Sequence, residues 1–432
     1  MPCSQKRLPE PVVGTPSLSS PSTFFRSVMT RSFWQHRGRP PALTCDVAIV
    51  GAGIAGASAA FWLRKARPNW TVALLDAVEP GHGASGRNAG FLLQGIATDY
   101  VTDIARYGRA TAQQLWHFTL ENRELLEKEL DPAAFNLQRT GSLIVAGSAA
   151  EDERLQQSVM PLRADGVPVA YVPPQEVSSR AQAGGLFGAL NVPSGATCDP
   201  LKLVRHIIAQ SDATVCPHHR VIDLIPQNGS VHLITPHRTV VAGQVLVTTN
   251  AAPVPGLVRP QGAIRPVRAQ MLATAPLASR VLSCPVYSHE GNYYLRQLSG
   301  GEVLLGGARH QHAAAEVGFA DATTPPVQDA LEAYLQRHFP WAAGAQVQRR
   351  WSGTMGFTAD RLPIIGSVPD APGSYWAGGF HGHGMGMAFR FGKLLAAMVA
   401  QDVAPNAAAL FRADRPALTA TSATVTESTP RS

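Results

Sequence analysis

The stretch at residues 46–90, DVAIVGAGIAGASAAFWLRKARPNWTVALLDAVEPGHGASGRNAG, decides the fold of this chain. Its apolar and largely β-branched run at 47–50 predicts a buried parallel strand. Residues 57–67 are rich in Ala and free of Pro and Gly, which predicts a helix that Pro68 ends. A second apolar run at 71–75 predicts another strand. The order strand, helix, strand is the opening unit of a doubly wound (Rossmann-type) α/β fold.

Three glycines between the first strand and the helix follow the spacing G-x-G-x-x-G, at Gly51, Gly53 and Gly56. The first allows a tight turn, the second lets the backbone approach a pyrophosphate, and the third lets the helix pack close to the strand. The helix N-terminus favours an anion there. Asp76, 20 residues beyond Gly56, suits a carboxylate that binds ribose hydroxyls. We therefore predict a dinucleotide site rather than a glycine-rich turn that binds nothing.

Composition excludes several classes of protein. The 432 residues are 45% hydrophobic and 16% charged, as in a globular enzyme of one large domain or two. No apolar run approaches the roughly 20 residues of a membrane-spanning helix. The sequence pI is about 9.4, but six basic residues and one acidic residue in 1–44 account for +5 of the net charge of +7. We therefore expect no nucleic-acid partner.

Cysteine usage and the termini complete the outline. The five cysteines are scattered without a C-x-x-C pair, which indicates a reducing, cytoplasmic location, no disulfide framework and no metal site. Residues 1–44 superficially resemble a transit peptide, but we favour a disordered basic tail or a gene start upstream of the true initiator Met29. Residues 413–432 are expected to be a second disordered tail. The cysteines are Cys3, Cys45, Cys198, Cys216 and Cys284.

The rest of the chain mixes predicted helices and strands. Helical patterns occupy 98–130, with a bend near Gly108, and 149–165, 201–211, 326–339 and 387–400. Strand patterns occupy 141–146, 221–225, 231–234, 245–249, 264–274, 293–295, 303–307 and 374–377, with a hairpin signal at Asn228-Gly229. Residues 166–194 are punctuated by Pro and Gly and are expected to be loop-like. The run of strands from 262 to 310 suits a substrate-covering sheet.

Three separated blocks together resemble the FAD-dependent D-amino acid oxidase/sarcosine oxidase superfamily. The first is the glycine loop with Asp76. The second, GASGRNAGF at 83–91, is similar to a loop of the γ-glutamylputrescine oxidase-like branch. The third comprises TADRLPIIG at 358–366 and GGFHGHGM at 378–385, and is similar to the C-terminal flavin motif of the family. The resemblance covers roughly residues 45–412, and the combination of blocks is specific.

The resemblance implies an FAD-binding domain assembled from discontinuous segments, with an antiparallel β-sheet substrate domain over the flavin. The FAD-binding segments would be 45–130, 195–255 and 346–412. Residues 131–194 would form a substrate or cap region, and residues 256–345 the substrate domain.

It also implies which residues bind the cofactor. The glycine loop, Asp76 and Val221 would hold the nucleotide end, and the second and third blocks would surround the flavin. FAD is expected to be non-covalent, because 353–358 lacks the cysteine that sarcosine oxidases use and Arg87 stands near the position of the histidine used by other relatives. The full set is Gly51, Gly53, Ile54, Ala55, Gly56, Asp76, Ala77, Gly83, Ala84, Ser85, Arg87, Asn88, Val221, Asn250, Gly366, Gly379, His383, Gly384 and Met385.

Two departures from the family pattern bear on the substrate. An arginine that grips the substrate carboxylate in amino-acid-oxidising relatives is replaced here by Met355. A second such arginine, found in the glycine oxidase-like branch, aligns with Gly382. Bidentate arginine–carboxylate recognition is hard to replace with Met or Gly. We therefore expect weak activity on simple α-amino acids, and an amine substrate whose carboxylate is absent or distal, such as a γ-glutamylputrescine-like compound.

The expected reaction is hydride transfer from the amine-bearing carbon to flavin N5, which gives an imine that hydrolyses. The candidate catalytic residues are His381, His383 and Tyr294. Tyr293 and Tyr294 alternate across a strand, so at most one faces the pocket. The electron acceptor is O₂ or unknown, because no lysine near residues 303–304 matches the one that promotes oxygen reactivity in sarcosine oxidases.

Two alternatives remain open. One is an N-methyl or D-amino acid oxidase or dehydrogenase of the sarcosine or glycine oxidase type, which a carboxylate site at Arg87 or Arg309 would favour. For Arg309, an exposed and solvated side chain is the other interpretation. The second alternative is a non-catalytic flavin-binding protein.

Overall fold

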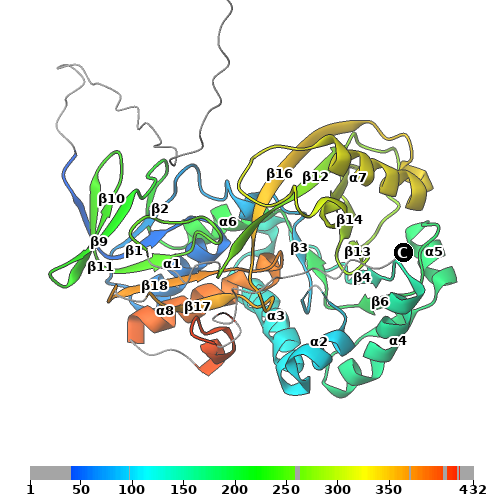
Figure 1. Cartoon of the computed structure of the whole chain (residues 1–432), viewed down its shortest axis with the longest axis horizontal. Helices are drawn as coiled ribbons and strands as arrows, with labels where there is room; N and C mark the ends of the chain where they lie inside the picture. The colour runs from blue at the N-terminus through cyan, green and yellow to red at the C-terminus, as the bar shows by residue number, and fades with distance from the viewer. Residues whose placement is uncertain are drawn as a thin grey trace, which may run out of the picture. The chain divides into compact units, whose positions relative to one another are not determined.

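The structure is a computed structural model, and it describes residues 40–96, 98–257, 263–368, 371–401, 406–415 and 418. The expectations for residues 1–39 (including a start at Met29) and for residues 419–432 lie outside the described residues. Two eight-stranded sheets organise the described part of the chain (Figure 1).

The first sheet is the predicted nucleotide fold. Its neighbours from β18 to β8 are parallel, and β17 is antiparallel to β18. A hairpin of β9 and β10 pairs with the start of β11, and its turn has positive φ at Asn228 and Gly229 (50° and 76°), as the Asn-Gly signal predicts. The main strand order is β17 (Ile364–Ser367), β18 (Ser374–Gly378), β11 (Thr239–Val247), β1 (Leu43–Val50), β2 (Val72–Leu75) and β8 (Thr214–Cys216), with β9 (Asp223–Gln227) and β10 (Ser230–Ile234) beside β11.

Helices cover one face of this sheet because alternate strand residues point to opposite sides. Val47 and Ile49 pack with the helices, whereas Ala48 and Val50 pack with a separate cluster that includes the β9–β10 hairpin. The predicted bend near Gly108, whose φ is 79°, divides the helical pattern at 98–130 into two helices. The helices on this face are α1 (Ile54–Ala66), α3 (Arg109–Glu129), α6 (Pro200–Ala209) and α8 (Ala388–Gln401), and α2 (Tyr100–Tyr107) precedes α3.

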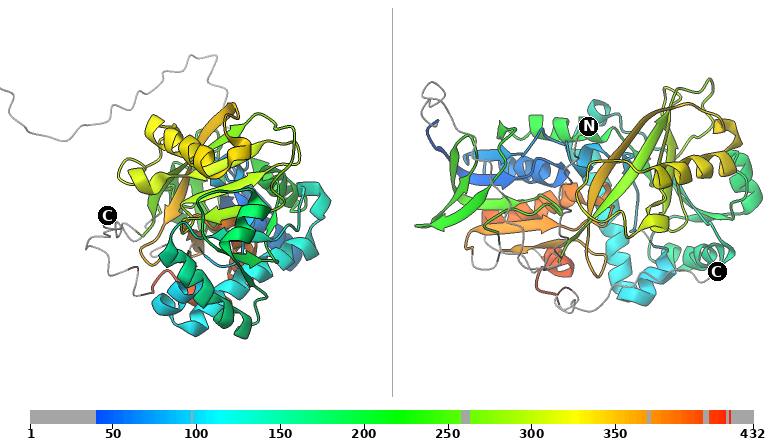
Figure 2. Two further views of the ribbon diagram at one scale, coloured as in Figure 1. Left: turned by 90° about the vertical axis from the view of Figure 1, so that its right-hand side faces the viewer. Right: turned by 45° about the horizontal axis from the view of Figure 1, so that its top comes forward.

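The second sheet is the expected antiparallel sheet, and its role in covering the substrate stays a prediction. Its neighbours are antiparallel except for the parallel pair β13–β4. Helix α7 (Pro325–His338) packs against these strands around Leu272, Leu305 and Leu335 (Figure 2). Its strand order is β16 (Val347–Phe357), β12 (Arg265–Thr274), β15 (Val303–Gly307), β14 (Tyr293–Gln297), β13 (Val286–Ser288), β4 (Ser142–Val145), β6 (Ala189–Val192) and β5 (Ala170–Val172).

Two segments differ from the sequence-based expectations. Residues 166–194 are not only loop, because they contain β5, α5 (Pro174–Ala181) and β6. These strands are too short for a clear pattern, and β6 is ordered by pairing with β4, more than forty residues earlier. Strand β16 pairs with β12 along its length. The proposed third FAD-binding segment, 346–412, therefore begins with a strand of the second sheet.

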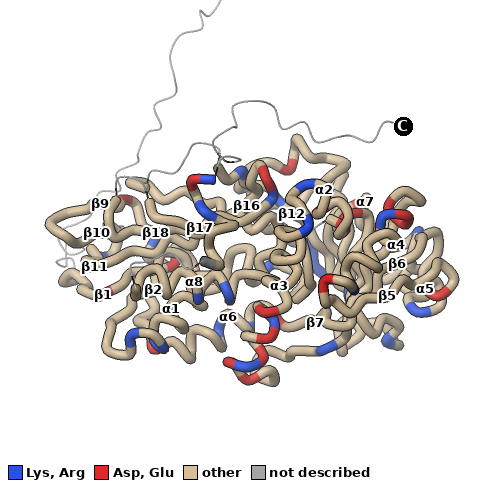
Figure 3. The backbone as a smooth tube through the Cα atoms, turned by 90° about the horizontal axis from the view of Figure 1, so that it is seen from below, with Lys and Arg blue, Asp and Glu red and all other residues tan. Residues whose placement is uncertain are grey.

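Short elements join these parts. Strand β3 (Phe91–Leu92) pairs with β7 (Ala196–Thr197), and α4 (Ala149–Ala164) packs beside α2. The 3₁₀ helices are η2 (Ala84–Gly86), η3 (Pro132–Phe135), η4 (Arg309–His312), η5 (Pro340–Ala342), η6 (Gly384–Gly386) and η7 (Asn406–Phe411). Within the described ranges, no helix is long and apolar enough to cross a membrane. Basic and acidic residues are interspersed along the backbone in the view of Figure 3.

Candidate active site

The glycine loop between β1 and α1 has the backbone that a dinucleotide site requires. Gly51 adopts φ +104°, and a Cβ there would lie 2.9 Å from the carbonyl oxygen of Thr248. A Cβ on Gly56 would overlap the Gly51 carbonyl oxygen and lie 2.6 Å from Thr248 Oγ1. Helix α1 begins after Gly53, which offers no side-chain cap. Apart from the N–H of Ile54, which donates to Ser85 Oγ, the first turn of α1 is therefore open to an anion.

Asp76, at the end of β2, stabilises this loop. Its carboxylate accepts hydrogen bonds from the backbone N–H groups of Ala52 and Val78, both at 2.9 Å. The backbone of Asp76 also accepts from the N–H of His219 at 2.7 Å, in the segment that follows β8. Val221, two residues later, is buried in the cluster behind the sheet. The glycine loop, Asp76 and Val221 thus follow the carboxyl ends of β1, β2 and β8, which are adjacent parallel strands.

The loop at 83–90 closes over the start of α1. Ser85 Oγ accepts from the N–H of Ile54 at 2.9 Å. The Asn88 amide donates to the carbonyl oxygens of Ala84 and Ser85 (3.0 and 2.9 Å), which makes the loop self-supporting. Gly83 and Ala77 lie in the same connection after β2. The loop therefore has a fixed backbone beside the glycine loop, as a cofactor-binding segment requires.

Arg87, in the same loop, points to the second sheet. Its Nη1 donates to Asp321 at 2.6 Å and to the carbonyl oxygen of Ser352 at 2.8 Å, and its Nε donates to the carbonyl oxygen of His82. In this structure Arg87 therefore joins the loop to β16. The predicted contact of Arg87 with the flavin stays a prediction.

The Gly-rich turn after β18 brings the third block to the same region. Asn250, three residues after β11, accepts a hydrogen bond from the N–H of Gly379 on its Oδ1 at 2.9 Å. Met385 is buried, and its carbonyl oxygen accepts from the Asn122 amide of α3. Gly384 begins η6. Gly366 lies in β17, opposite Trp376 and against Ala413, which is a packing position.

The two candidate histidines differ in their contacts. His383 has its Nδ1 3.1 Å from the carbonyl oxygen of His381 and its Nε2 3.3 Å from the hydroxyl of Tyr287. Burial lowers the pKa of His383, so the ring is neutral near pH 7. Because a carbonyl oxygen only accepts, Nδ1 carries the hydrogen and Nε2 accepts from Tyr287. Tyr287 therefore belongs to the candidate site, although the sequence analysis did not identify it.

His381 has an unsatisfied ring nitrogen. Its side chain packs on Phe357, with ring centroids 4.0 Å apart, and its Nδ1 is buried without a hydrogen-bond partner among the described residues. Burial, reinforced by Arg361, holds the pKa of His381 well below its usual 6.5. The ring is therefore neutral, and Nδ1 is open to a hydrogen bond from or to a bound molecule.

The two tyrosines of β14 separate as expected. Tyr293 packs into the core and stacks on Tyr334 of α7 at a centroid distance of 3.8 Å. Tyr294 lies on the opposite side of the strand, in edge contact with Phe91, and is paired in register with Tyr287. Burial raises its pKa to about 12. Tyr294 therefore shares its face of the sheet with Tyr287, beside the histidines.

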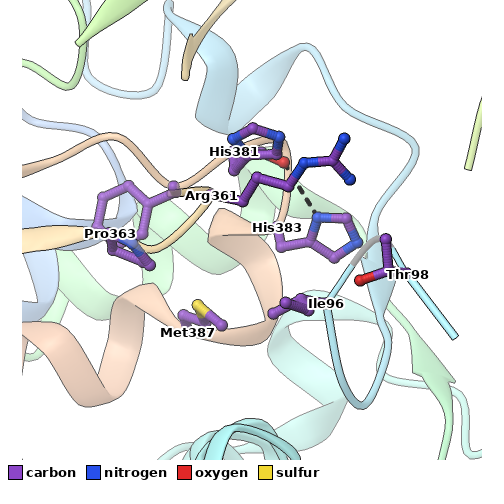
Figure 4. Close-up of a pocket in the computed structure, with 8 residues that line it drawn as sticks. Ile96, Thr98, Arg361, Pro363, His381, His383 and Met387 are labelled. Atoms are coloured by element: carbon purple, nitrogen blue, oxygen red, sulfur yellow. Dashed lines mark hydrogen bonds between the residues drawn. The ribbon is translucent and has the colours of Figure 1, made fainter. Parts of the chain in front are cut away.

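A small cavity of about 10 Å³ lies beside these histidines (Figure 4). Arg361 extends between His381 and His383, and its backbone has φ +64° in the turn after β16. Asp360 shapes this turn by accepting from the N–H of Leu362, and it pairs with Arg415 at 2.6 Å. The lining residues are Ile96, Thr98, Arg361, Pro363, Phe380, His381, His383 and Met387.

The two positions that lack arginine are neighbours. A Cβ on Gly382 would lie 3.3 Å from the sulfur of Met355. An apolar thioether therefore occupies the region where the resemblance would place carboxylate-binding arginines. The Arg309 side chain is half-buried, and its guanidinium lies 4.7 Å from the centroid of the Phe357 ring. It therefore differs from the exposed, solvated side chain that was one interpretation of the sequence.

Comparisons with known proteins agree with this geometry. The family described as FAD dependent oxidoreductase matches residues 46–398. The γ-glutamylputrescine oxidoreductase of Escherichia coli strain K12 is 28% identical over 377 residues, which cover 84% of this chain and 85% of that protein. The glycine oxidase of Geobacillus kaustophilus is 25% identical and covers 83% and 95%. Its crystal structure superposes with a TM-score of 0.70 at 22% identity, over 87% of this chain and 99% of that chain.

Proposed function

The chain belongs to the family of FAD-dependent oxidoreductases, and we propose that it oxidises the C–N bond of an amine that has no carboxylate adjacent to the amine group. The predicted resemblance, the FAD cofactor and the assignment as an enzyme that acts on amines or amino acids are confirmed at the level of the family. The glycine loop and the open first turn of α1 fit the pyrophosphate of FAD.

FAD, when bound, supplies the acceptor for the hydride that leaves the carbon next to the nitrogen. The amine nitrogen also loses a proton, and the resulting imine is hydrolysed by water to a carbonyl compound and the released amine. The protein contributes binding and orientation. Because Tyr287 donates its hydrogen to His383 Nε2, the lone pairs of the Tyr287 oxygen remain to accept an N–H of the amine.

The observation that carries the proposal is the closeness of Met355 to Gly382, where an added Cβ would lie 3.3 Å from the Met355 sulfur. An α-carboxylate placed there would meet a thioether and would lack the bidentate, charge-assisted hydrogen bonds that an arginine supplies. An amine without an adjacent carboxylate does not need them. The similarity to γ-glutamylputrescine oxidoreductase supports the same substrate class.

The test is anaerobic titration of the purified yellow protein with γ-glutamylputrescine, putrescine, sarcosine, glycine and D-alanine, followed by its absorbance spectrum. We expect γ-glutamylputrescine or putrescine to bleach the flavin fastest. Faster bleaching by glycine or D-alanine would contradict the proposal. When air is admitted, rapid return of the yellow colour indicates an oxidase and slow return a dehydrogenase. A yellow supernatant after acid precipitation of the protein supports the proposed non-covalent FAD.

A second candidate is oxidation of N-methyl or D-amino acids, as the similarity to glycine oxidase would suggest. The half-buried Arg309 beside Phe357 favours it, because it could bind a carboxylate. Fast bleaching by sarcosine, with slow bleaching by putrescine, would select this candidate.

A further inference from the structure

We propose that Arg361 and His381 form a binding site for an anionic group of the substrate, in the cavity whose lining includes neither Met355 nor Gly382. This inference rests on the proposed function, because it specifies the far end of the amine that the same site would oxidise. The group it would bind is a carboxylate, separated by several bonds from the carbon that is oxidised.

The first observation is a cation without a counter-ion. Among the described residues, none makes a hydrogen bond or ion pair with the guanidinium of Arg361. Burial lowers the pKa of this arginine. The side chain is half-buried and lines the cavity in Figure 4. A partly desolvated arginine without an anion is unfavourable by itself, and its planar fork matches a carboxylate.

The second observation is independent of charge. The buried Nδ1 of His381 has no hydrogen-bond partner among the described residues, and its ring lines the same cavity. A neutral imidazole can carry its hydrogen on this nitrogen and donate it to an acceptor. Arg361 and His381 together can therefore present donors to one small space.

The surrounding charges favour an anion. The charges of Arg106 and Arg309 act to lower the pKa of Arg361 and that of Glu290 acts to raise it, while the neighbouring Asp360 carboxylate is paired with Arg415. The Glu290 carboxylate is already paired with Arg154. Positive charge therefore outweighs negative charge near Arg361, and a substrate carboxylate would be attracted to it.

The position of the site separates it from the expected α-carboxylate site. Met355 and Gly382 are neighbours and are absent from the described residues that line this cavity. The cavity has space for about one water molecule. Binding therefore requires the untethered side chain of Arg361 to turn toward the carboxylate, which its rotatable bonds allow.

The experiment compares pentanoate with pentanamide, which have the same length and differ in charge. Binding to the FAD-loaded protein is measured from the change in the flavin absorbance spectrum and, independently, from intrinsic fluorescence. We expect pentanoate to bind more tightly than pentanamide. Arg361→Gln should weaken pentanoate about 10- to 100-fold, as expected for the loss of a charge-assisted hydrogen bond, and leave pentanamide unchanged.

Three further variants make the result specific. Arg361→Lys should restore part of the affinity, and His381→Asn, which keeps a residue that tolerates positive φ, should cost less than Arg361→Gln. Arg349→Gln, which changes an exposed arginine of β16, should behave as the wild type. Equal affinity of the wild type for both ligands, or unchanged pentanoate affinity in Arg361→Gln, would overturn the proposal.

This design separates the two proposals. Pentanoate carries no amine, so its binding can be measured even if no amine reduces the flavin. Selective pentanoate binding without any amine oxidation would refute the proposed function and leave the anion site standing. Amine oxidation with no preference for pentanoate would do the opposite.

Discussion

Replacement of Glu316 by Gln tests how the second sheet holds the segment that reaches the loop at 83–90. The Glu316 side chain is fully buried, and its partner Arg268 is only 8% exposed. Its oxygens accept from Arg268 Nε at 2.8 Å and Nη2 at 2.6 Å, and from the Gln270 amide at 3.0 Å. Five residues later, Asp321 accepts from Arg87. The buried pair thus anchors a segment that contacts the loop at 83–90.

The expected magnitude follows from burial. Glu316→Gln would leave the Arg268 cation buried without a counter-charge, which costs about 3–5 kcal/mol. The pair between Glu332 and Arg350 belongs to the same region of the second sheet, but both side chains are 35% exposed. Glu332→Gln should therefore cost only about 0.2–1 kcal/mol. The difference between two identical substitutions isolates the effect of desolvation.

The assay is urea unfolding followed by far-UV circular dichroism, with FAD in the same excess throughout because bound cofactor adds stability. The double variant Arg268→Met/Glu316→Leu should lose less than Glu316→Gln. A loss below about 1 kcal/mol for Glu316→Gln, equal to that of Glu332→Gln, would refute the reasoning.

The pH dependence of this pair has a definite sign. Burial alone would raise the pKa of Glu316, but the hydrogen bonds from Arg268 and Gln270 lower it below its usual 4.5. The contribution of Glu316 to stability is therefore present above pH 4.5 and is lost as the pH falls through its lower folded-state value. Glu316→Gln should lack this acid-dependent loss.

Three further predictions concern the buried Asp103, the glycine loop and the substrate position at Met355. Burial raises the pKa of Asp103 from 3.8 to about 7, so the free energy of unfolding should fall as the pH rises between these values. Asp103→Asn should reduce this fall, measured by urea unfolding at about pH 5 and pH 8, and an unchanged fall would contradict the assignment. Gly56→Ala should weaken FAD binding about tenfold or more in a fluorescence titration, because the new Cβ would overlap the Gly51 carbonyl oxygen. The control Gly184→Ala, whose Cβ has no atom within 4 Å, should leave FAD binding unchanged. Met355→Arg should raise the rate of flavin reduction by D-alanine relative to putrescine by about tenfold, as a new charge-assisted contact would; an unchanged ratio would argue against the role of this position.

The local pattern of residues determined the nucleotide fold. Strand β1, helix α1 and strand β2 lie where the apolar runs and the Ala-rich segment predicted them, and Asn228-Gly229 forms its hairpin turn. These features depend on neighbours in sequence, since backbone propensity, glycine conformation and apolar periodicity act over a few residues. The three motif blocks were also enough to predict the family and its FAD cofactor. Individual cofactor contacts and the roles of His381, His383 and Tyr294 stay predictions.

Only the tertiary structure brought the remaining site residues together. The partner of Arg87 is Asp321, 234 residues away, and Tyr287 reaches His383 because the register of β13 and β14 places it on the face of Tyr294. The buried Arg296 of β14 donates hydrogen bonds to the carbonyl oxygens of Ala89 and Cys198. No local sequence pattern predicts these contacts. The same holds for β5 and β6, whose order comes from pairing with distant strands. Sequence spacing constrains which residues are neighbours along an element, but the meeting of two elements depends on sheet register and side-chain packing across the whole chain.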